Sequence, residues 1–192
     1  MTTLSQVADV RSGQAFRGAV QAEEGSDVRV IQMRNVDPDT GVDWSGLDPC
    51  TPPGKKPFWL REGDILVQGR GRNTFAVRLG QLPFDKVICT QHFFIIRLHD
   101  EKLTAPFLEW QLNQATAQRH IDSHTPDTNS RHITLATMLT IPIVFADTET
   151  QEKVGKLIEL MRKERGVFKA FMAKREQQMA AIASRLLMEG SQ

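Results

Sequence analysis

The last forty or so residues carry the longest regular pattern of apolar positions in the chain. From Thr148 onward, apolar side chains recur every three or four residues without a proline and with only two glycines, at 155 and 166. This spacing predicts one helix of about 38 residues, roughly 57 Å long. Thr148 and Gln151 have the spacing of a capping box at its start. The a and d positions of its heptads are Val154, Ile158, Met161, Arg165, Phe168, Met172, Arg175, Met179, Ile182 and Leu186.

A heptad pattern of this length predicts a coiled-coil seam that packs against another helix, because a body of about 150 residues cannot cover the whole stripe. Arg165 and Arg175 interrupt the seam and would help to select its partner or register. The alternative is a long edge helix folded back along its own domain. We therefore expect a partner-binding helix in residues 148–192, after a globular domain in residues 1–147.

The globular part mixes short strand-like and helix-like patterns. Apolar runs that predict strands lie at 28–33, 64–68, 75–79, 87–98 and 141–145, and a DPDTG turn lies at 37–41. Helical spacing lies at 4–11, ended by Gly13, at 104–121, with Thr104 as a possible N-cap, and around Leu135. Strands and helices do not alternate regularly, so the predicted fold class is α+β.

The composition indicates a globular protein with a hydrophobic core and a locally basic region. With 40% hydrophobic residues, the 192-residue chain can bury a core. No run is long and apolar enough for a membrane helix, and the start lacks a secretory pattern, so we expect a soluble, cytoplasmic protein. Cys50 and Cys89 lack metal-ligand spacing and are taken as ordinary residues. The net charge is +1, but residues 54–78 hold six basic and two acidic residues, which favours a local anion-binding face.

Catalytic and metal-binding patterns are weak. His120 and His124 are four residues apart, with Asp127 and His132 nearby, but residues 122–126 read as a loop, and solvated or DNA-facing histidines are the better interpretation. His92 is expected within a strand. The GRGRN segment at 69–73 lacks the phosphate-loop pattern, and no GxSxG or HExxH motif is present. We predict no catalytic residue, no metal and no cofactor.

The remaining chemistry suits nucleic-acid recognition. Arg70, Arg72 and Asn73 occupy a loop after a predicted strand, where arginine can bond guanine and asparagine can bond adenine. Lys55 and Lys56 suit phosphates, because an ammonium group is a point charge. A second predicted DNA contact consists of Asn129, Ser130, Arg131 and His132. A solvated loop remains the alternative for the arginine–asparagine group and for the two lysines.

Several motifs occur in a familiar order. They are LSQVADVRSGQAF, GDIL, QHFFIIRL, APFLEWQLN, and SRHITLATMLTIPI followed by TQEKVGKLIEL. Together they resemble the target-recognition domain of a type I restriction-modification specificity subunit over almost the whole chain. VFADTETQ stands where that family often has PPL-x-EQ, and keeps only Gln151. The resemblance implies double-stranded DNA and a modification methyltransferase as partners, with S-adenosylmethionine bound by the methyltransferase.

Members of this family usually contain two recognition domains and two long helices that pack antiparallel. The present sequence has one of each, so the resemblance implies a half-subunit that forms a homodimer through residues 151–188 and reads an interrupted palindrome. Participation of a restriction nuclease subunit stays open. The competing hypotheses are a protein-interaction adaptor, whose long helix docks a partner, and an enzyme with an unrecognised site.

Overall fold

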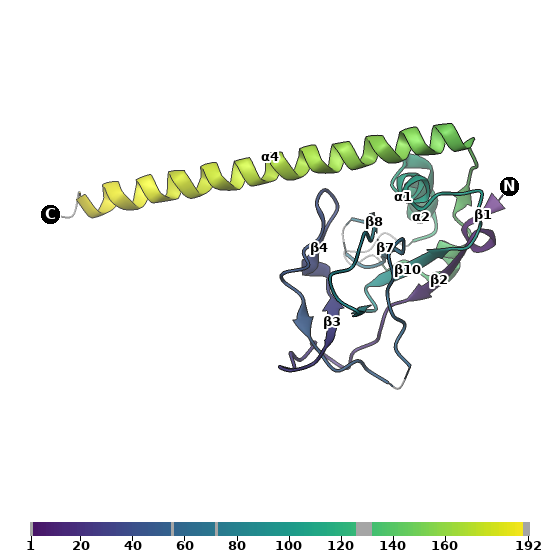
Figure 1. Cartoon of the computed structure of the whole chain (residues 1–192), viewed down its shortest axis with the longest axis horizontal. Helices are drawn as coiled ribbons and strands as arrows, with labels where there is room; N and C mark the ends of the chain where they lie inside the picture. The colour runs from purple at the N-terminus through teal and green to yellow at the C-terminus, as the bar shows by residue number, and fades with distance from the viewer. Residues whose placement is uncertain (1, 55, 72, 126–131, 190–192) are drawn as a thin grey trace.

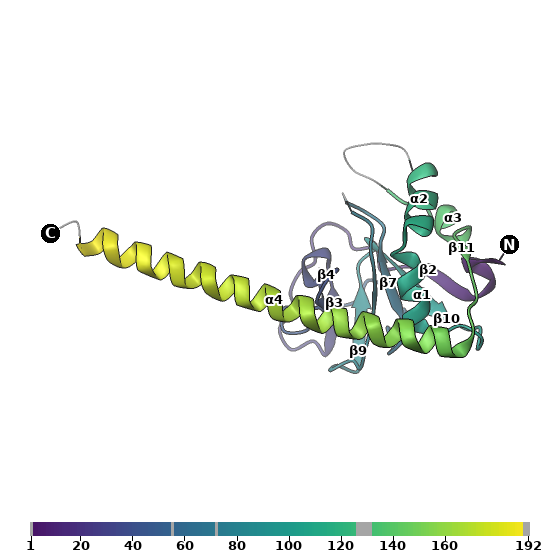
Figure 2. The same ribbon diagram turned by 90° about the horizontal axis from the view of Figure 1, so that it is seen from above.

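A long helix lies across a globular body and extends well beyond it (Figure 1). This computed structural model describes residues 2–54, 56–71, 73–125 and 132–189. The long helix, α4, runs from Thr148–Glu189, and its first half lies over the shorter helix α1. Seen from above, α2 and α3 lie farther from α4 than α1 does (Figure 2). None of the helices in the described ranges is long and apolar enough to cross a membrane.

The body is built from short strands in four small sheets. Its main sheet has the order β2-β10-β7-β8 and is antiparallel throughout, while β6-β3-β9 includes a parallel β3–β9 pair. The other pairs are β4–β5 and β1–β11. The strands are β1 Thr2–Thr3, β2 Ala8–Ser12, β3 Val28–Ile31, β4 Val36–Asp37, β5 Gly41–Val42, β6 Asp48–Pro49, β7 Ile65–Gln68, β8 Ala76–Arg78, β9 Lys86–Cys89, β10 Phe93–Leu98 and β11 Pro142–Ile143.

Helices cover one face of the main sheet. The shorter helices are η1 Leu4–Gln6 and η2 Met33–Asn35, both 3-10, and α1 Ala105–Leu112, α2 Ala115–Ser123 and α3 Leu135–Leu139. Alternate residues of a strand point to opposite faces, so Ile65 of β7 packs with α1 to α3 while Leu66 packs with β3 and β9. Because both faces of β7 and β10 are buried, the sequences of these strands are mostly apolar and do not alternate with polar residues.

The predicted α+β class and long C-terminal helix are confirmed. Two local predictions in the sheet region are wrong. Residues 4–11 form η1 and β2 instead of one helix, because Ala8–Ser12 pairs with the edge of β10. The apolar run at 87–98 is divided between β9 and β10, which belong to different sheets. His92 therefore lies in the turn between them and not inside a strand.

The predicted helix at 104–121 is interrupted. Asn113 and Gln114 separate the predicted helix into two helices, α1 and α2. The Asn113 side chain pairs with the edge of β8: its oxygen accepts the N–H of Ala76 at 2.9 Å and its amide donates to the Ala76 carbonyl at 2.9 Å. Thr104 lies at the N-cap position of α1, but its side chain makes no capping hydrogen bond.

The predicted capping box of α4 is also wrong. Asp147, and not Thr148, caps the helix, because its carboxylate accepts the N–H of Thr150 at 2.8 Å. Gln151 is instead buried against the globular part. Its side-chain oxygen accepts the N–H of Thr104 at 2.8 Å, and its amide donates to the carbonyls of Lys102 and Ala146. Gln151 thus anchors the start of α4 to the chain before α1.

Candidate nucleic-acid interface

The connection between β7 and β8 holds part of the predicted DNA-contact set. Gly69 donates its N–H to the carbonyl of His92 at 2.8 Å, and a side chain at Gly69 would collide with the ring of Phe94. Gly71 adopts φ +110°, a conformation that favours glycine. Buried Gln68 donates its side-chain amide to the Arg70 carbonyl at 2.8 Å. These constraints fix the backbone that presents Arg70.

Two of the predicted contact segments meet in space. Arg70 and His132, which are 62 positions apart in sequence, form an isolated antiparallel β-bridge. Next to it, the N–H of Ile133 donates to the Gly69 carbonyl at 2.9 Å, and the Ile133 side chain is buried in the main core. His132 is itself exposed. The bridge therefore joins the β7–β8 connection to the segment before α3.

A shallow cleft of about 260 Å³ lies at this bridge. Its apolar lining includes Phe94 and Leu135, and polar side chains from three connections surround it. The residues that line the cleft are Ser12, Gly69, Arg70, Gln91, Phe94, His132, Ile133 and Leu135. The Nε atom of Arg70 is buried and has no hydrogen-bond partner within the described part of the chain. A buried donor without a partner is costly, and an acceptor from a ligand would satisfy it.

The Arg70 guanidinium also acts on His92 beside the cleft. Desolvation by burial lowers the pKa of His92, and the nearby Arg70 guanidinium lowers it further. Nδ1 of His92 lies 3.2 Å from the hydroxyl of Thr90 in the β9–β10 turn. The lowered pKa of His92 thus reflects both its burial and the positive charge at Arg70.

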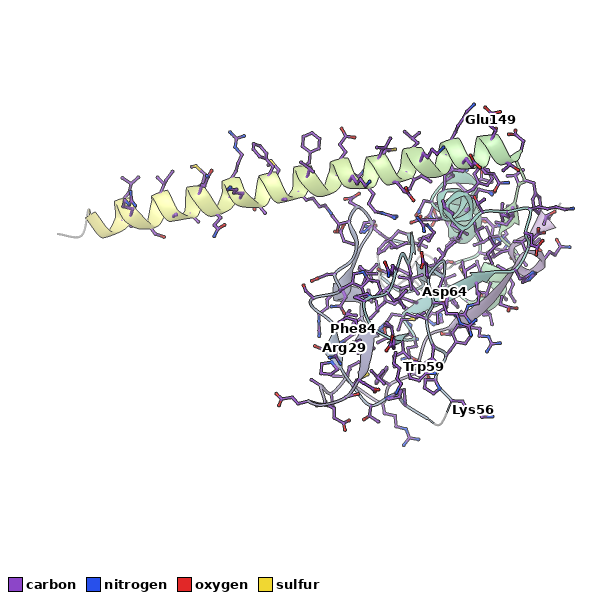
Figure 3. All side chains as sticks on the ribbon, in the orientation of Figure 1. Arg29, Lys56, Trp59, Asp64, Phe84 and Glu149 are labelled. Atoms are coloured by element: carbon purple, nitrogen blue, oxygen red, sulfur yellow. The ribbon has the colours of Figure 1, made fainter. Side chains whose placement is uncertain are left out.

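Of the other predicted contact residues, the structure describes Asn73 and Lys56. Asn73 is exposed on the same connection as Arg70. Lys56 is exposed at the end of the body opposite α4 and does not line the cleft (Figure 3). Predictions for Lys55, Arg72, Asn129, Ser130 and Arg131 lie outside the described residues.

Two polar residues of the cleft, Ser12 and Gln91, were not predicted as contacts. Ser12 ends β2 and follows directly after the helix predicted at 4–11, whereas Gln91 lies in the β9–β10 turn, inside the strand predicted at 87–98. The signal for Gln91 was present. Thr90, Gln91 and His92 form a polar triplet within an otherwise apolar run, which is typical of a turn between two strands.

His120 and His124 do not support a metal site. Their rings stack with centroids 4.3 Å apart, and Nε2 of His120 lies 3.0 Å from the hydroxyl of Thr140. The helix α2 continues to Ser123, two residues into the predicted loop at 122–126, and ends just before His124. No group of three or more potential ligands that could hold a metal is found among the described residues. Cys50 and Cys89 are free and buried.

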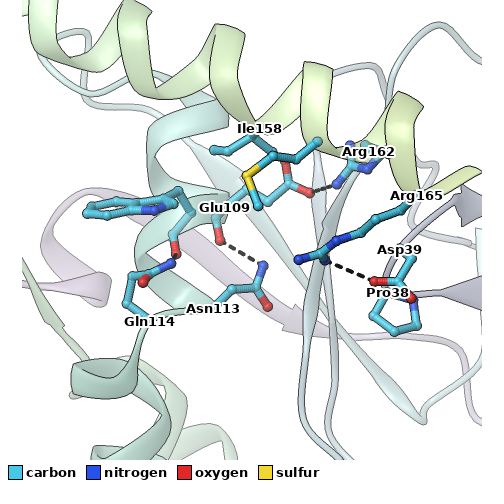
Figure 4. Close-up of a pocket in the computed structure, with 10 residues that line it drawn as sticks. Pro38, Asp39, Glu109, Asn113, Gln114, Ile158, Arg162 and Arg165 are labelled. Carbon is cyan, nitrogen blue, oxygen red and sulfur yellow. Dashed lines mark hydrogen bonds and ion pairs between the residues drawn. The ribbon is translucent and has the colours of Figure 1, made fainter.

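A second cleft, of about 400 Å³, lies where α4 meets the body (Figure 4). Glu109 of α1, only 1% exposed, forms an ion pair with Arg162 of α4 and lies 3.8 Å from Nε of Arg78. Its Oε1 also accepts the N–H of Arg78 at 2.9 Å. Arg78 in turn contacts Glu159 of α4 at 3.1 Å. These charges therefore tie α4 to both α1 and β8.

A third contact ties α4 to the β4–β5 turn. Arg165 pairs with Asp39 at 2.9 Å, and Lys169 pairs with Asp37 at 2.7 Å. Burial raises the pKa of Asp37, but the hydrogen bonds from Lys169 and from the turn backbone outweigh it, so the pKa is lowered overall. Arg165, predicted to lie in a seam between helices, therefore contacts its own domain.

The predicted seam divides into two parts along α4. Val154 packs against the main core and Ile158 is half-buried beside α1, whereas the seam positions from Phe168 to Leu186 are exposed. Most of the large exposed apolar side chains in the described part of the chain lie on α4. The edge-helix alternative thus describes its first half, and pairing of the second half with a partner stays a prediction.

Comparison with solved structures identifies the fold. One match is a type I restriction-modification S subunit from M. genitalium, with TM-score 0.55 and 13% identity over 83% of this chain and 37% of that chain. Another is the HsdS subunit from Thermoanaerobacter tengcongensis, with TM-score 0.58 and 16% identity over 88% and 38%. A chain from a study of assembly and conformational transition in a type I system has TM-score 0.64 and 16% identity over 94% and 42%.

The protein therefore has the fold of the S subunits of type I restriction-modification systems, as the resemblance in the sequence predicted. At these identities the likeness concerns the fold. The chain spans about two fifths of the length of the matched structures. No family model and no curated protein matches the sequence.

Proposed function

We propose that this chain recognises a specific sequence in double-stranded DNA and acts as half of the specificity subunit of a type I modification complex. The observation that carries this proposal is the Arg70–His132 bridge, which gathers polar side chains from separate segments at one cleft of an S-subunit fold. Arg70 can donate to the O6 and N7 atoms of guanine, and Gln91 can pair with adenine. Lys56 would contact phosphate without reading sequence.

The unpartnered Nε of Arg70 supports this role. DNA offers acceptors both on base edges and on phosphates, and either kind would complete the hydrogen bonds of this guanidinium. The apolar lining from Phe94 and Leu135 suits contact with the methyl group of thymine. The cleft therefore combines charged and apolar groups in the manner of a base-reading surface.

The proposed complex contains two copies of this chain and a modification methyltransferase, which would bind the methyl donor. A single copy matches about two fifths of each S-subunit structure, so two copies would supply two recognition domains and two long helices. Leu160 and Val167, 63% and 70% exposed, offer an apolar face on α4 for the methyltransferase. Such a complex acts on DNA in the cytoplasm and has its catalytic groups in the partner subunits.

Binding to a duplex enriched from a random pool, compared with a scrambled duplex, tests the proposal. The chain should prefer the enriched duplex, with an affinity that falls steeply as salt rises. Arg70→Ala and Gln91→Ala should each remove about 1 to 3 kcal/mol of sequence discrimination, whereas Lys56→Ala should weaken binding to both duplexes alike. Lys153→Ala on α4 serves as the matched control, because it removes an exposed cation outside the cleft.

The exposed apolar face of α4 favours a second candidate function, a protein-interaction adaptor. In that case the globular part would anchor the helix and would not read DNA. Equal affinity for the enriched and scrambled duplexes, measured with the methyltransferase present, would favour the adaptor. A preference that Arg70→Ala abolishes would exclude it.

A further inference from the structure

Gln68 is a buried amide at the end of a strand that is otherwise apolar. It closes β7 after Ile65, Leu66 and Val67, and it is only 8% exposed. Phe93 of β10 lies opposite it in the sheet. A buried amide without a hydrogen bond is costly, so an apolar side chain would suit this position better unless the amide has a specific partner.

The partner of this amide is the backbone of Arg70. Nε2 of Gln68 donates to the Arg70 carbonyl at 2.8 Å, across the intervening Gly69. The following residue, Gly71, has φ +110°, and a Cβ atom there would lie 2.8 Å from Nε2 of Gln68. Glycine at position 71 therefore lets the chain fold closely around the Gln68 side chain. The start of the β7–β8 connection is thus built on this amide.

Two separate contacts hold the backbone at Arg70. The Gln68 amide binds its carbonyl, and the β-bridge joins it to His132. Next to the bridge, the Gly69 carbonyl accepts the N–H of Ile133, whose side chain is buried in the main core. A side chain on such an ordered backbone loses less conformational freedom when it binds than one on a mobile loop. The two contacts therefore prepare Arg70 for binding.

Gln68 does not itself belong to the cleft. Arg70, Gln91 and His132 line it, whereas Gln68 is not among the described residues that do. Its burial leaves little surface for direct contact with DNA. Any effect of Gln68 on recognition must therefore act through Arg70.

We infer that Gln68 is a positioning residue that holds Arg70 in place for base recognition. The inference rests on the proposed function, because it concerns the arginine that this function uses to read DNA. Bidentate bonding to guanine depends on the placement of the guanidinium, whereas a phosphate contact carries no sequence information. Loss of the Gln68 amide therefore lowers sequence discrimination and leaves non-specific affinity nearly unchanged.

Replacement of Gln68 by methionine tests this role, because methionine has a similar length and lacks the amide. Gln68→Met should lower the preference for the enriched over the scrambled duplex roughly fivefold to tenfold, with affinity for the scrambled duplex within about twofold of the wild type. Gln111→Met is the matched control. Gln111 is 6% exposed, and its Nε2 donates to the Val144 carbonyl at 2.9 Å, away from the cleft.

The control separates positioning from general support of the fold. Gln111→Met should lower the free energy of unfolding and leave the duplex preference as it is in the wild type. If the Gln68 amide only supports the fold, Gln68→Met will behave in the same way. A Gln68→Met chain that keeps the full preference would overturn the inference.

Gly71→Ala disturbs the same contact without changing β7. Its Cβ atom would crowd Nε2 of Gln68, and alanine is strained at a positive φ. We expect a loss of preference similar to that of Gln68→Met, which keeps the test available if the methionine variant is too unstable. Gly63→Ala is the matched control, because Gly63 has φ +84° and open space around it, away from the cleft. Wild-type preference in Gly71→Ala would contradict the inference.

NMR relaxation of the backbone N–H of Arg70 gives a readout that needs no DNA. In Gln68→Met its order parameter should fall from the range of a rigid backbone, about 0.85, toward 0.6, and in Gln111→Met it should not change. An equally ordered Arg70 in the wild type and in Gln68→Met would overturn the inference alone. A wild-type chain without any duplex preference would overturn the proposed function, and with it the base-reading role that Gln68 supports.

Discussion

Apolar side chains are buried in the globular body but exposed on the free half of α4, which is the part of the helix beyond Gly166. In the body they are buried on both faces of the main sheet, whereas beyond Gly166 they stand exposed along a helix that contacts little else. The body can be stable as one chain. The free half carries large apolar side chains, as a buried helix does, but these side chains are exposed. Its apolar residues therefore favour association with a partner over a role in folding of the monomer. The comparison separates residues that maintain the fold from residues that we propose bind a partner.

The joint between these regions should give the largest loss of stability. Glu109→Ala removes a buried carboxylate that pairs with Arg162 and accepts the backbone N–H of Arg78, so Arg162 loses this ion pair while Arg78 keeps its contact with Glu159. We expect the free energy of unfolding to fall by about 3 to 5 kcal/mol. Chemical denaturation measures this change, with the exposed Glu152→Ala as control. Equal stability of the two variants would show that the joint does not support the body.

Truncation of one apolar side chain in each region sharpens the comparison. Leu108→Ala, at a fully buried site in the core, should lower the free energy of unfolding by about 2 to 5 kcal/mol. Ile182→Ala, at a site 54% exposed in the single chain, should leave it within about 0.5 kcal/mol when measured in dilute monomer. The same Ile182 variant should weaken self-association. A large loss of monomer stability from Ile182→Ala would contradict the division into two regions.

The contact with the β4–β5 turn should have a smaller effect. Asp37→Asn removes one of the two carboxylates that pair with Lys169, the other being Asp39. Because the Asp37 and Lys169 side chains are partly exposed, the loss should stay below about 1 kcal/mol and shrink in high salt. The pKa of Asp37 is lowered from 3.8, so its contribution is present above that value and is lost as pH falls through the folded-state pKa. Wild type and variant should therefore converge in stability at acidic pH. A difference that grows as pH falls would oppose this assignment.

The smallest expected effect lies beside the cleft. Arg70→Ala should raise the pKa of His92 toward its ordinary value, although burial would still hold it below 6.5. In the wild type, a lowered histidine pKa means that the unfolded chain binds more protons, so His92 opposes folding as pH falls through 6.5 toward the folded-state pKa. NMR titration of the His92 ring measures the shift. An unchanged pKa would mean that the guanidinium lies too far away to act on His92.

Sequence patterns predicted most elements whose burial is determined locally. The strands near residues 28, 65 and 76 and the long helix follow directly from apolar spacing. Errors arose where a distant partner decides the local structure. Residues 8–12 extend because β10 offers an edge, and α1 ends where the Asn113 side chain pairs with the backbone of Ala76. Neither partner is visible in the local sequence.

The candidate site was predicted only in part for the same reason. Arginine and asparagine in a glycine-containing loop indicated recognition chemistry near residue 70, but the bridge to His132 depends on how the chain returns after α2. Gln91 lies within an apolar run that the sequence pattern predicts as a single strand. For α4, spacing revealed the apolar face but could not indicate which part of it packs against α1. Only the packed structure shows which part of the apolar face packs against α1 and which part is exposed.

Selection of duplexes from a random pool by the wild-type chain, alone and with the methyltransferase, tests the central claim most directly. Two identical recognition domains related by a two-fold axis should enrich an inverted repeat with a fixed spacing between its halves. The Arg70→Ala variant should lose that enrichment while it keeps non-specific affinity. A pool that shows no enriched sequence under either condition would contradict the account.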